Sequence, residues 1–552
     1  MTTEPPAAPS SYVPGAAPVP LSQLSISQLR QLASSHGAPA TGTRAELEAA
    51  CTRRGVTAAA PRDIANQSAA PAAGGTLIAQ FETAEGERTG PQLDVPADTT
   101  APQLQLILNE LLGNEDRVPY AFYVAEEEVS GTLGEALGSA SAEQTLRVVY
   151  VPQAIFRVRA VTRCTSTLSG HSEAILSAQF SADGRTLATG SGDCCVRLWD
   201  VMTETPRATL KAPAAESRLR RRPSSSGALR APPLPLQAHR DWVLAVAWSP
   251  CGKYIASGGK DGRCFAPRRP QVIDAHKKWV NALAWEPLAE SRLASASKDG
   301  TVRLWERVGG RCAGTLCGHA NSVTCLRWGG EGLLYSGSQD RTVKVWAPDE
   351  SKLVRSLEGH GHWVNCLSAS TDFALRRGPF DHRGVAPADE AAAKAGAAQR
   401  YAEARGTAEL LASGSDDFTV FLWAPAAGKK PIARLTGHVQ LVNAVTFSPD
   451  GQWLASGSFD GAIRLWAART GKFVAALRGH VGAVYQLAWS GDSRLLASGS
   501  KDSTVKVWEL KSRKLKEDLP GHADEVYSVD WSPDGERVAS GGKDRNLKMW
   551  RR

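Results

Sequence analysis

Four residue types that could act together in acid–base chemistry recur at fixed spacings in this sequence of 552 residues. A dipeptide that ends in histidine occurs eight times, and in seven cases an aspartate follows 21 to 23 residues later. In the remaining case Asp417 follows His360 by 57 residues. A serine or threonine stands four residues before each aspartate, and a tryptophan stands six residues after seven of them. Histidine, aspartate and a hydroxyl are the groups of a hydrolase triad.

The repetition itself favours a structural role over a catalytic one. Eight copies of one catalytic site in a single chain are implausible, whereas buried polar groups everywhere need hydrogen-bond partners. We therefore predict that these residues form a repeated structural network. The sets assigned to it are His171, Thr189, Asp193 and Trp199; His319, Ser336, Asp340 and Trp346; His438, Ser456, Asp460 and Trp466; His480, Ser498, Asp502 and Trp508; and His522, Ser540, Asp544 and Trp550.

The spacing of the network residues predicts the fold that must position them. Without two inserts the repeats average about 41 residues, a period typical of β-propellers. Alternating segments such as residues 242–248 and 526–531, separated by turn signals, predict several antiparallel strands per repeat. The pattern resembles the WD-repeat family over about residues 165–552. The resemblance implies that each histidine bridges the aspartate of a tight turn and the strand hydroxyl, which reaches the indole.

We therefore predict a mainly β chain in which residues 152–552 form an eight-bladed WD-repeat propeller. Because repeat arrays need their ends tied, the apolar segment 156–162 is expected to supply the strand that completes the last blade. The second repeat lacks the tryptophan and carries two prolines and three arginines in residues 262–270. Since proline cannot donate to a central strand ladder, we expect this second blade to be incomplete.

Two inserts interrupt the repeats. The first, at about residues 211–237, is rich in Pro, Ser and basic side chains. Its arginines could bind RNA phosphates or act as a nuclear import signal, or the segment could be a solvated loop. The arginines concerned are Arg218, Arg220, Arg221 and Arg222. The second insert, at about residues 373–408, contains an Ala-rich stretch, 388–405, that predicts a helix.

The first 75 residues divide into three segments. Residues 1–20 form a disordered tail and residues 56–75 a linker, because both are rich in Ala, Pro, Ser and Gly. Between them, residues 21–55 contain two capping-box spacings, at 25–28 and 43–46, that each predict a short helix. This segment resembles a SAP-type helical module, which implies a possible contact with nucleic acid. A small protein-docking helical hairpin is the alternative.

Residues 76–151 are predicted to form a ubiquitin-like α+β domain of the β-grasp type. Alternating segments at 76–81 and 92–95 read as a hairpin, residues 100–112 as an amphipathic helix, and residues 120–124 and 146–151 as two later strands. Three further stretches are more specific. They are LLGNEDRVPY at 111–120, PQAIFRVRAVTRC at 152–164 and PGHADEVY at 520–527.

These three stretches resemble the notchless family of assembly factors for the large ribosomal subunit, in which the ubiquitin-like domain is called the NLE domain. The resemblance implies binding to the metal-ion-dependent adhesion site of midasin, an AAA-type ATPase, through one acidic residue. The matching position is Glu115, and Asp116 is its neighbour and competitor. A carboxylate can complete an Mg²⁺ site in the partner. The alternative for Glu115 is a solvated loop carboxylate.

Composition and motifs narrow the function further. Apolar residues make up 42% and charged residues 22%, as in globular proteins, and the net charge is +8. We expect a chain that is neither secreted nor membrane-bound, because it shows no signal peptide and no apolar run of about 18 residues. The ten cysteines form no CxxC pair, so we expect buried thiols without zinc or disulfides. Phosphate-loop, HExxH and nucleophile-elbow motifs are absent.

The sequence therefore predicts a non-catalytic ribosome assembly factor with no cofactor of its own. It would act in the nucleus and nucleolus as a monomer within a larger assembly. Its expected partners are a midasin-type ATPase, which shares its Mg²⁺ at the interface, and the proteins and rRNA of the precursor large subunit. Two alternatives stay open: a WD-repeat adaptor in signalling or ubiquitin ligation, and a chromatin-binding protein that uses the SAP-like module.

Overall fold

The computed structural model describes residues 76–83, 86–112, 119–124, 127–129, 131–134, 146–152, 158–210, 239–267, 270–288, 291–307, 310–381, 384–387 and 389–552. The predicted tail, SAP-like module and linker lie outside these residues. So do Glu115, Asp116 and the four arginines of the first insert. Within the described part, no helix has both the length and the apolar character to cross a bilayer.

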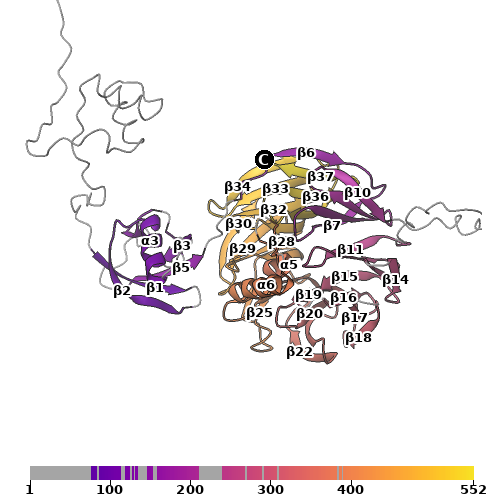
Figure 1. Ribbon diagram of the computed structural model, residues 1–552, viewed down its shortest axis with the longest axis horizontal. Helices are drawn as coiled ribbons and strands as arrows, with labels where there is room; N and C mark the ends of the chain where they lie inside the picture. Colours follow the sequence, from indigo (N-terminus) through magenta and orange to yellow (C-terminus); the bar gives the residue numbers. More distant parts are fainter. Residues whose placement is uncertain are drawn as a thin grey trace, which may run out of the picture. The chain divides into compact units, whose positions relative to one another are not determined.

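The N-terminal domain is a five-stranded mixed sheet with one helix (Figure 1). Its strand order is β2-β1-β5-β3-β4, and β1 and β5 run parallel at the centre. The elements match those predicted, except that the short β4 was not expected. The bounds are β1 Thr76–Thr83, β2 Arg88–Pro96, α3 Ala101–Leu112, β3 Tyr120–Val124, β4 Glu127–Glu128 and β5 Leu146–Pro152.

The core of this domain follows from the two periodicities of strand and helix. Alternate residues of a strand share one face, and Phe81 and Phe122 meet edge to face with ring centres 6.1 Å apart. Both phenylalanines are buried, as are Leu104 and Leu108, which lie one turn apart on α3. These two leucines therefore anchor the helix on the sheet. The second of them, Leu108, lies one turn before the last residue of the helix, Leu112.

The rest of the described chain forms eight four-stranded antiparallel sheets, which we call blades 1 to 8. Blades 1 to 4 consist of β7 Ile175–Phe180, β8 Thr186–Ser191, β9 Val196–Asp200 and β10 Thr205–Leu210; β11 Val243–Trp248, β12 Ile255–Gly259, β13 Arg263–Pro267 and β14 Pro270–Asp274; β15 Val280–Trp285, β16 Arg292–Ser297, β17 Thr301–Glu306 and β18 Cys312–Cys317; and β19 Val323–Trp328, β20 Leu334–Ser338, β21 Thr342–Ala347 and β22 Lys352–Glu358.

Blades 5 to 8 repeat this arrangement, and the last of them takes its outer strand from the start of the series. They consist of β23 Val364–Ala369, β24 Leu411–Ser415, β25 Val420–Trp423 and β26 Ala433–Leu435; β27 Val442–Phe447, β28 Trp453–Ser458, β29 Ala462–Ala467 and β30 Phe473–Arg478; β31 Val484–Trp489, β32 Leu495–Ser500, β33 Thr504–Glu509 and β34 Lys514–Pro520; and β35 Val526–Trp531, β36 Val538–Gly542, β37 Leu547–Arg551 and β6 Arg163–Leu168.

The eight blades close into a ring (Figure 1). The innermost strand of each blade contacts that of the next, and β35 of blade 8 contacts β7 of blade 1. Apolar side chains fill the space between neighbours, as where Val302 of blade 3 clusters with Leu326 and Trp346 of blade 4. The indole Nε1 of Trp328 also donates to the carbonyl of Ala284 in the preceding blade at 3.0 Å.

Blade 8 is completed by β6, so the chain ends are tied as expected, but by a different segment from the one predicted. The predicted strand was 156–162, whereas the outer strand is Arg163–Leu168, with Trp550 opposite Cys164. The preceding apolar residues are used for packing: Val158 and Val161 are buried in the cluster between blades 7 and 8. The N–H of Val158 also donates to Asp492 at 2.7 Å.

The prediction that blade 2 is incomplete was wrong. Blade 2 has four strands, although β12 and β13 pair at only two positions, Ser257 with Phe265 and Gly258 with Cys264. The outer pair β13 and β14 aligns over five positions and ends at Pro267 opposite Pro270. The prolines therefore stand at the hairpin end, where the lack of an N–H donor interrupts no further ladder.

The second insert contains the predicted helix and a shorter one before it. These are α5 Asp372–Arg377 and α6 Glu390–Arg405, and the Asp389 side chain caps α6 by accepting from the N–H of Ala391. Both lie between β23 and β24, in the inner hairpin of blade 5. Figure 1 shows them over the ring, and the contacts of the insert as a whole extend to blades 1, 2, 4 and 8.

Candidate functional site

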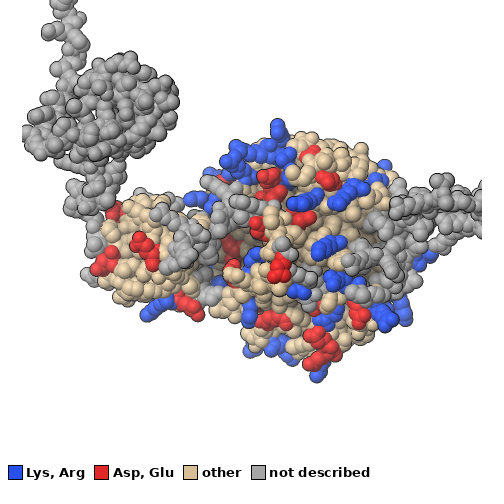
Figure 2. All heavy atoms as spheres, viewed as in Figure 1, with Lys and Arg blue, Asp and Glu red and all other residues tan. Residues whose placement is uncertain are grey.

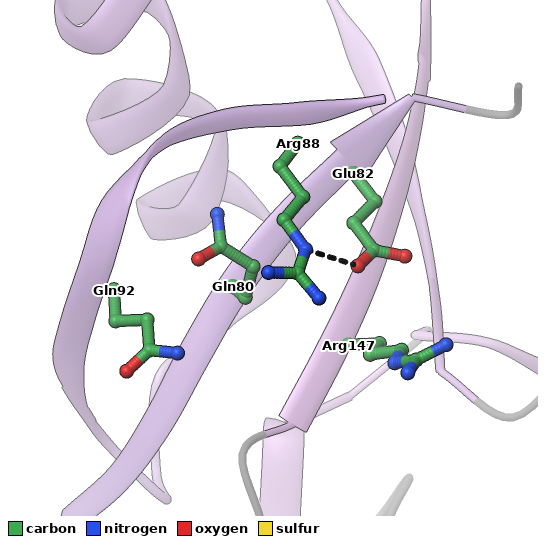
Figure 3. A pocket seen from close by; sticks show the side chains of 5 residues that line it. All are labelled: Gln80, Glu82, Arg88, Gln92 and Arg147. Atoms are coloured by element: carbon green, nitrogen blue, oxygen red, sulfur yellow. Dashed lines mark ion pairs between the residues drawn. The ribbon is translucent and has the colours of Figure 1, made fainter. Parts of the chain in front are cut away.

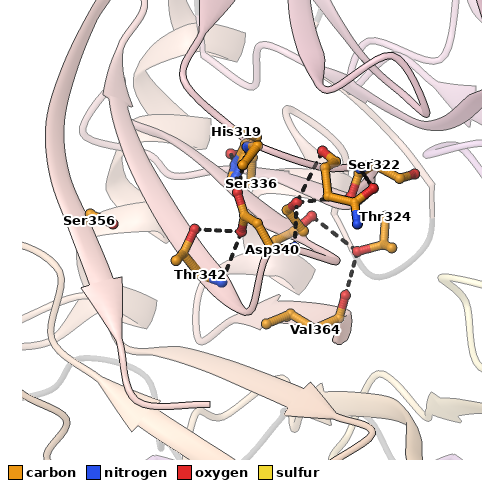
Figure 4. A network of polar contacts seen from close by, with 12 residues as sticks. His319, Ser322, Thr324, Ser336, Asp340, Thr342, Ser356 and Val364 are labelled. Atoms are coloured by element: carbon orange, nitrogen blue, oxygen red, sulfur yellow. Dashed lines mark hydrogen bonds and ion pairs between the residues drawn. The ribbon is translucent and has the colours of Figure 1, made fainter. Parts of the chain in front are cut away.

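The predicted network forms in blade 4, and Figure 4 shows His319, Ser336 and Asp340 of it. His319 Nδ1 lies 2.7 Å from Asp340 Oδ2, and His319 Nε2 lies 2.7 Å from Ser336 Oγ. The indole Nε1 of Trp346 donates to the same Ser336 Oγ at 2.8 Å. A carboxylate can only accept, so Nδ1 carries the imidazole proton and Nε2 accepts from the hydroxyl. Every polar atom in this chain of contacts then has a partner.

The other blades repeat this geometry. Across all eight blades the histidine–aspartate distance is 2.7 to 3.0 Å, and the histidine–hydroxyl distance is also 2.7 to 3.0 Å. In the seven blades with the tryptophan, its Nε1 donates to the hydroxyl at 2.7 to 2.9 Å. Trp423, the tryptophan of the network in blade 5, is only 1% exposed.

Blade 5 shows that the network tolerates a large interruption. The insert places Asp417 57 residues after His360, yet His360 Nδ1 lies 2.9 Å from Asp417 Oδ2 and Nε2 lies 2.7 Å from Ser413 Oγ. The insert leaves and re-enters through the hairpin between β23 and β24, so the strands that carry these residues keep their register. The irregular spacing in the sequence is therefore a loop insertion, not a lost blade.

The electrostatics of the network favour a charged aspartate and, in blades 3 and 6, a neutral histidine. Burial acts to raise the pKa of Asp340, but hydrogen bonds from His319 and Thr342 outweigh it and hold that pKa well below its usual range. In blade 3, burial lowers the pKa of His276, against the opposing effect of Asp299. In blade 3 the aspartate thus orients a neutral imidazole, as it would in a hydrolase triad.

Accessibility separates these sets from a hydrolase triad. All eight hydroxyl-bearing residues are buried, and the most exposed of them, Ser257, is only 5% exposed. In seven blades the hydroxyl oxygen also accepts from the indole N–H. A carbonyl substrate could not reach such an oxygen without opening the blade. The network therefore stabilises the sheets and the turns that hold the aspartates.

The sequence-predicted Glu115 and Asp116 lie outside the described residues, between α3 and β3. The described elements on either side are well anchored, since Leu108 of α3 and Phe122 of β3 are both buried. On the sheet, a polar hollow is lined by Gln80, Glu82, Arg88, Gln92 and Arg147 (Figure 3). Arg88 Nε and Glu82 Oε1 lie 3.6 Å apart there.

Sequence reasoning missed how the second insert is held. Arg376 of α5 forms an ion pair with Asp530 of β35 in blade 8, with Nη1 2.8 Å from Oδ1. Asp372 of the same helix lies 3.4 Å from Arg327 of β19 in blade 4. Both partners occupy the next-to-last position of an inner strand, where Ala284 stands in blade 3. A charged residue at this position was the available signal.

Glu409 forms a second attachment at the end of the insert. Its carboxylate accepts from the Tyr335 hydroxyl at 3.0 Å and from the Thr371 hydroxyl, and Gly330 N lies 3.4 Å away. Burial raises the pKa of Glu409, against these hydrogen bonds. Tyr401 of α6 packs against Gly330. The insert is thus built onto blade 4 as well as onto blade 8.

The described cysteines form no disulfide with one another, and they are not all buried as predicted. Cys164, Cys312 and Cys317 are exposed because they lie on the outermost strands β6 and β18, whereas Cys264 and Cys325 are buried. Burial raises the pKa of the Cys264 thiol to about 12. Among the described residues, no group of three His, Cys, Asp or Glu side chains could hold a metal ion.

Comparison with family models supports the division into two parts. The NLE (NUC135) domain model matches residues 77–137. The WD domain, G-beta repeat model matches seven segments, at 162–200, 232–265, 268–306, 310–347, 429–467, 471–509 and 513–551. No segment is matched between 347 and 429, where the insert divides blade 5.

Curated relatives resemble the chain over most of its length. "Notchless protein homolog" of Arabidopsis thaliana is 48% identical over 406 residues, covering 73% of this chain and 82% of the relative. "Ribosome assembly protein 4" of Saccharomyces cerevisiae is 42% identical over 423 residues, covering 71% and 77%. "Protein Notchless" of Drosophila melanogaster is 45% identical over 405 residues, covering 68% and 75%. With an NLE domain followed by WD repeats, the chain belongs to the Notchless family of ribosome assembly proteins.

Proposed function

We propose that this protein is a non-catalytic assembly factor for the large ribosomal subunit. Its eight blades would act as a WD-repeat propeller that docks on the precursor subunit, and its ubiquitin-like NLE domain would bind the adhesion site of a midasin-type ATPase. The observation that carries the proposal is the presence of both domain types in one chain, together with relatives named for ribosome assembly. Such a factor would act in the nucleus and nucleolus.

In this proposal the contact with the ATPase is a single carboxylate. Glu115 would donate one oxygen ligand to the partner's Mg²⁺, because this ion takes oxygen ligands and keeps positions that a second protein can fill. The order of elements supports such a role for Glu115, since the segment that contains it directly follows α3, whose buried residues Leu104 and Leu108 fix the helix on the sheet. Force from ATP hydrolysis could then pass from this segment into the folded domain.

The ring is suited to hold the cargo during such a pull. Its blades are joined through apolar clusters and hydrogen bonds between neighbours. The strand β6, which precedes blade 1 in the sequence, pairs with β37 of the last blade. Figure 2 shows lysine and arginine side chains gathered at the rim of the ring over β34. Lys511, Arg513, Lys514 and Lys516 are exposed there, and cations of this kind can bind rRNA phosphates.

Replacement of Glu115 tests the proposed contact. Binding of the full chain to the isolated adhesion domain of the ATPase is measured by calorimetry with Mg²⁺ and with EDTA. We expect Mg²⁺-dependent binding that Glu115→Ala abolishes and Glu115→Asp weakens. Asp116→Ala is the matched control, one residue away with the same charge change, and it should retain binding. Equal affinity of Glu115→Ala and the parent protein would exclude this role for Glu115.

Sedimentation of cell extracts distinguishes the alternative functions. An assembly factor should travel with nuclear precursors of the large subunit, an adaptor with ubiquitin-ligase subunits, and a chromatin protein with DNA. Deletion of residues 1–60 removes the SAP-like module, so it should abolish association only for the chromatin protein. Absence of the chain from all precursor fractions would contradict the assembly role, whatever the result with the ATPase.

A further inference from the structure

Two exposed tryptophans and two lysines form a continuous surface on neighbouring blades 2 and 3. Lys260 Nζ lies 4.9 Å from the ring centre of Trp242 and 4.8 Å from that of Trp279. Lys298 Nζ lies 4.1 Å from the ring centre of Trp279. The four side chains thus alternate as indole, ammonium, indole, ammonium across the two blades. We call them the tryptophan–lysine surface.

The backbone fixes each pair of this surface. The N–H of Lys260 donates to the carbonyl of Trp242 at 2.8 Å, and the N–H of Lys298 donates to the carbonyl of Trp279 at 2.9 Å. These bonds join the loop that precedes the inner strand to the turn between the second and third strands of the same blade. The tryptophans are 48% and 38% exposed, which is unusual for so large an apolar side chain.

The fold does not require tryptophan and lysine at these positions. The same backbone hydrogen bond occurs in every blade, with other side chains at its two ends. The other six pairs are Ala174 with Gly192, Ser322 with Gln339, Trp363 with Asp416, Leu441 with Phe459, Ala483 with Lys501, and Glu525 with Lys543. Only blades 2 and 3 combine tryptophan with lysine, so the backbone arrangement that all blades share does not depend on this combination.

The charge around this surface selects an anionic ligand. The two loops that carry the tryptophans also carry the exposed cations Arg240, Lys277 and Lys278. Among the described residues of these loops the only acidic one is Asp241, which is partly buried and accepts from the N–H of Trp242 at 2.8 Å. Asp261 and Asp299, which follow Lys260 and Lys298 in the sequence, are engaged by His239 and His276. Flat indoles among cations are the elements of a single-strand nucleic-acid platform, where bases stack on rings and phosphates meet lysines.

We propose that the tryptophan–lysine surface binds single-stranded RNA, with bases stacked on Trp242 and Trp279 and phosphates held by Lys260 and Lys298. In the free protein each ammonium lies over an indole in an exposed cation–π contact. Charge-assisted hydrogen bonds to phosphate are stronger, so an arriving strand can draw the lysines aside and uncover the rings. The choice of RNA rests on the proposed function, whereas the surface itself does not.

Binding of the purified full chain to a fluorescein-labelled single-stranded RNA of about twelve nucleotides tests this inference by anisotropy. We expect each of Trp242→Ala and Trp279→Ala to weaken binding about tenfold, as for a lost stacking contact. Lys260→Gln with Lys298→Gln should reduce the slope of log affinity against log salt by about 1.4, for two phosphate contacts on a single strand. Indole fluorescence should be quenched on binding in the parent protein.

Two control variants isolate the surface. Trp363 occupies the equivalent position in blade 5 and is 42% exposed, but its partner is Asp416, so Trp363→Ala should leave RNA binding unchanged. Lys543 occupies the equivalent lysine position in blade 8, where Asp524 lies 3.3 Å from it, so Lys543→Gln should also have no effect. All four aromatic and lysine positions are at the surface, so the variants should fold like the parent.

Three outcomes would overturn the inference. One is unchanged RNA affinity in both tryptophan variants. Another is that an RNA duplex of the same length binds as tightly as the single strand and that only the lysine substitutions weaken its binding. That result would indicate phosphate binding without stacking. The third is that polyglutamate displaces the RNA from the tryptophan variants as well as it does from the parent protein, which would indicate an acidic protein partner. None of these results bears on whether the chain sediments with ribosome precursors, so the proposed function is tested separately.

Discussion

Arg376, in the insert of blade 5, pairs with Asp530 in the inner strand of blade 8, where both terminal guanidinium nitrogens, Nη1 and Nη2, donate to the carboxylate. Asp530 is 5% exposed and also accepts from the N–H of Phe180 in blade 1 at 2.8 Å. One carboxylate therefore links blade 8, blade 1 and the insert. The insert of blade 5 is thereby held to blades that are not its neighbours in the ring.

Loss of the guanidinium should destabilise the ring more than loss of a surface ion pair. Arg376→Ala leaves the buried Asp530 carboxylate without its charged partner, which costs about 2–4 kcal/mol. Lys352→Ala is the control, because Lys352 and Glu350 are both largely exposed and 3.8 Å apart, and such pairs contribute at most about 1 kcal/mol. Urea unfolding followed by tryptophan fluorescence measures both, and equal effects would contradict the role of the Arg376 ion pair.

The network hydroxyl should be costly to remove. Ser336→Ala leaves both His319 Nε2 and the Trp346 N–H buried without a partner, so we expect a loss of about 2–4 kcal/mol in the free energy of unfolding. Ser356→Ala removes a partly exposed hydroxyl on the outer strand of the same blade and should cost less than about 0.5 kcal/mol. If the two variants unfold at the same denaturant concentration, the network contributes nothing to stability.

Acidification should destabilise the propeller in two steps. Below about pH 6.5 the unfolded chain takes up protons at His276 and His438 more readily than the folded one, because burial lowers their pKa in the fold. Near pH 4 the same happens at Asp340, Asp417 and Asp502, whose pKa lies well below the usual value, because histidine and threonine hydrogen bonds outweigh burial.

Both steps have the same sign, since a depressed pKa in the folded state gives stability that is present above the unfolded pKa and is lost as the pH falls. Thermal unfolding from pH 7 to pH 3.5 should show a falling midpoint. Asp340→Asn should have a lower midpoint at pH 7 and a smaller decrease below about pH 4. A parallel decrease in the variant would exclude Asp340 as a source of the acid effect.

A glycine at the tip of the insert should be needed for its docking. Gly384 has φ +72°, and an added Cβ would lie 2.4 Å from the carbonyl oxygen of Asp183 in blade 1. Gly332 has a similar φ of +77° but open space around it, so Gly332→Ala measures the backbone strain alone, about 1 kcal/mol. We expect Gly384→Ala to cost clearly more and to expose α6 to limited proteolysis. Equal cleavage of the two variants would contradict this contact.

The helix α3, which precedes Glu115 in the sequence, should be held by its buried face. Leu108→Ala creates a cavity under the sheet and should cost about 2–5 kcal/mol in the NLE domain, which would weaken ATPase binding without touching Glu115. Leu106→Ala is the control on the same helix, because Leu106 is 46% exposed. Calorimetric scans that show both variants unchanged would mean that α3 does not pack as described.

The local sequence pattern was sufficient to predict a residue's role wherever that role depends on contacts within its own repeat. His171, Asp193 and Trp199 could be assigned from spacing because they meet within one sheet, and hairpin register carries that spacing into space. The same holds for α3 and for the Ala-rich α6, which follow from periodicity and helix propensity. Helix propensity did not indicate where α6 would lie.

Boundaries and contacts between repeats were beyond local pattern. The segment 156–162 has the composition of a strand, but β6 begins at Arg163 because the strand paired with β37 must lie opposite Trp550. Blade 2 kept four strands because Pro267 and Pro270 fall at the end of a hairpin, a register that composition does not reveal.

The sequence by itself determined the repeat, the network residues and the β-propeller class, since these are written in spacings within single repeats, and three specific stretches, two of them outside the repeats, identified the family. Only the tertiary structure decided that Arg376 reaches Asp530 across the ring and that Lys260 lies between Trp242 and Trp279. Those contacts join residues of different blades, and the distance between blades is set by ring closure and packing, for which sequence separation is no guide.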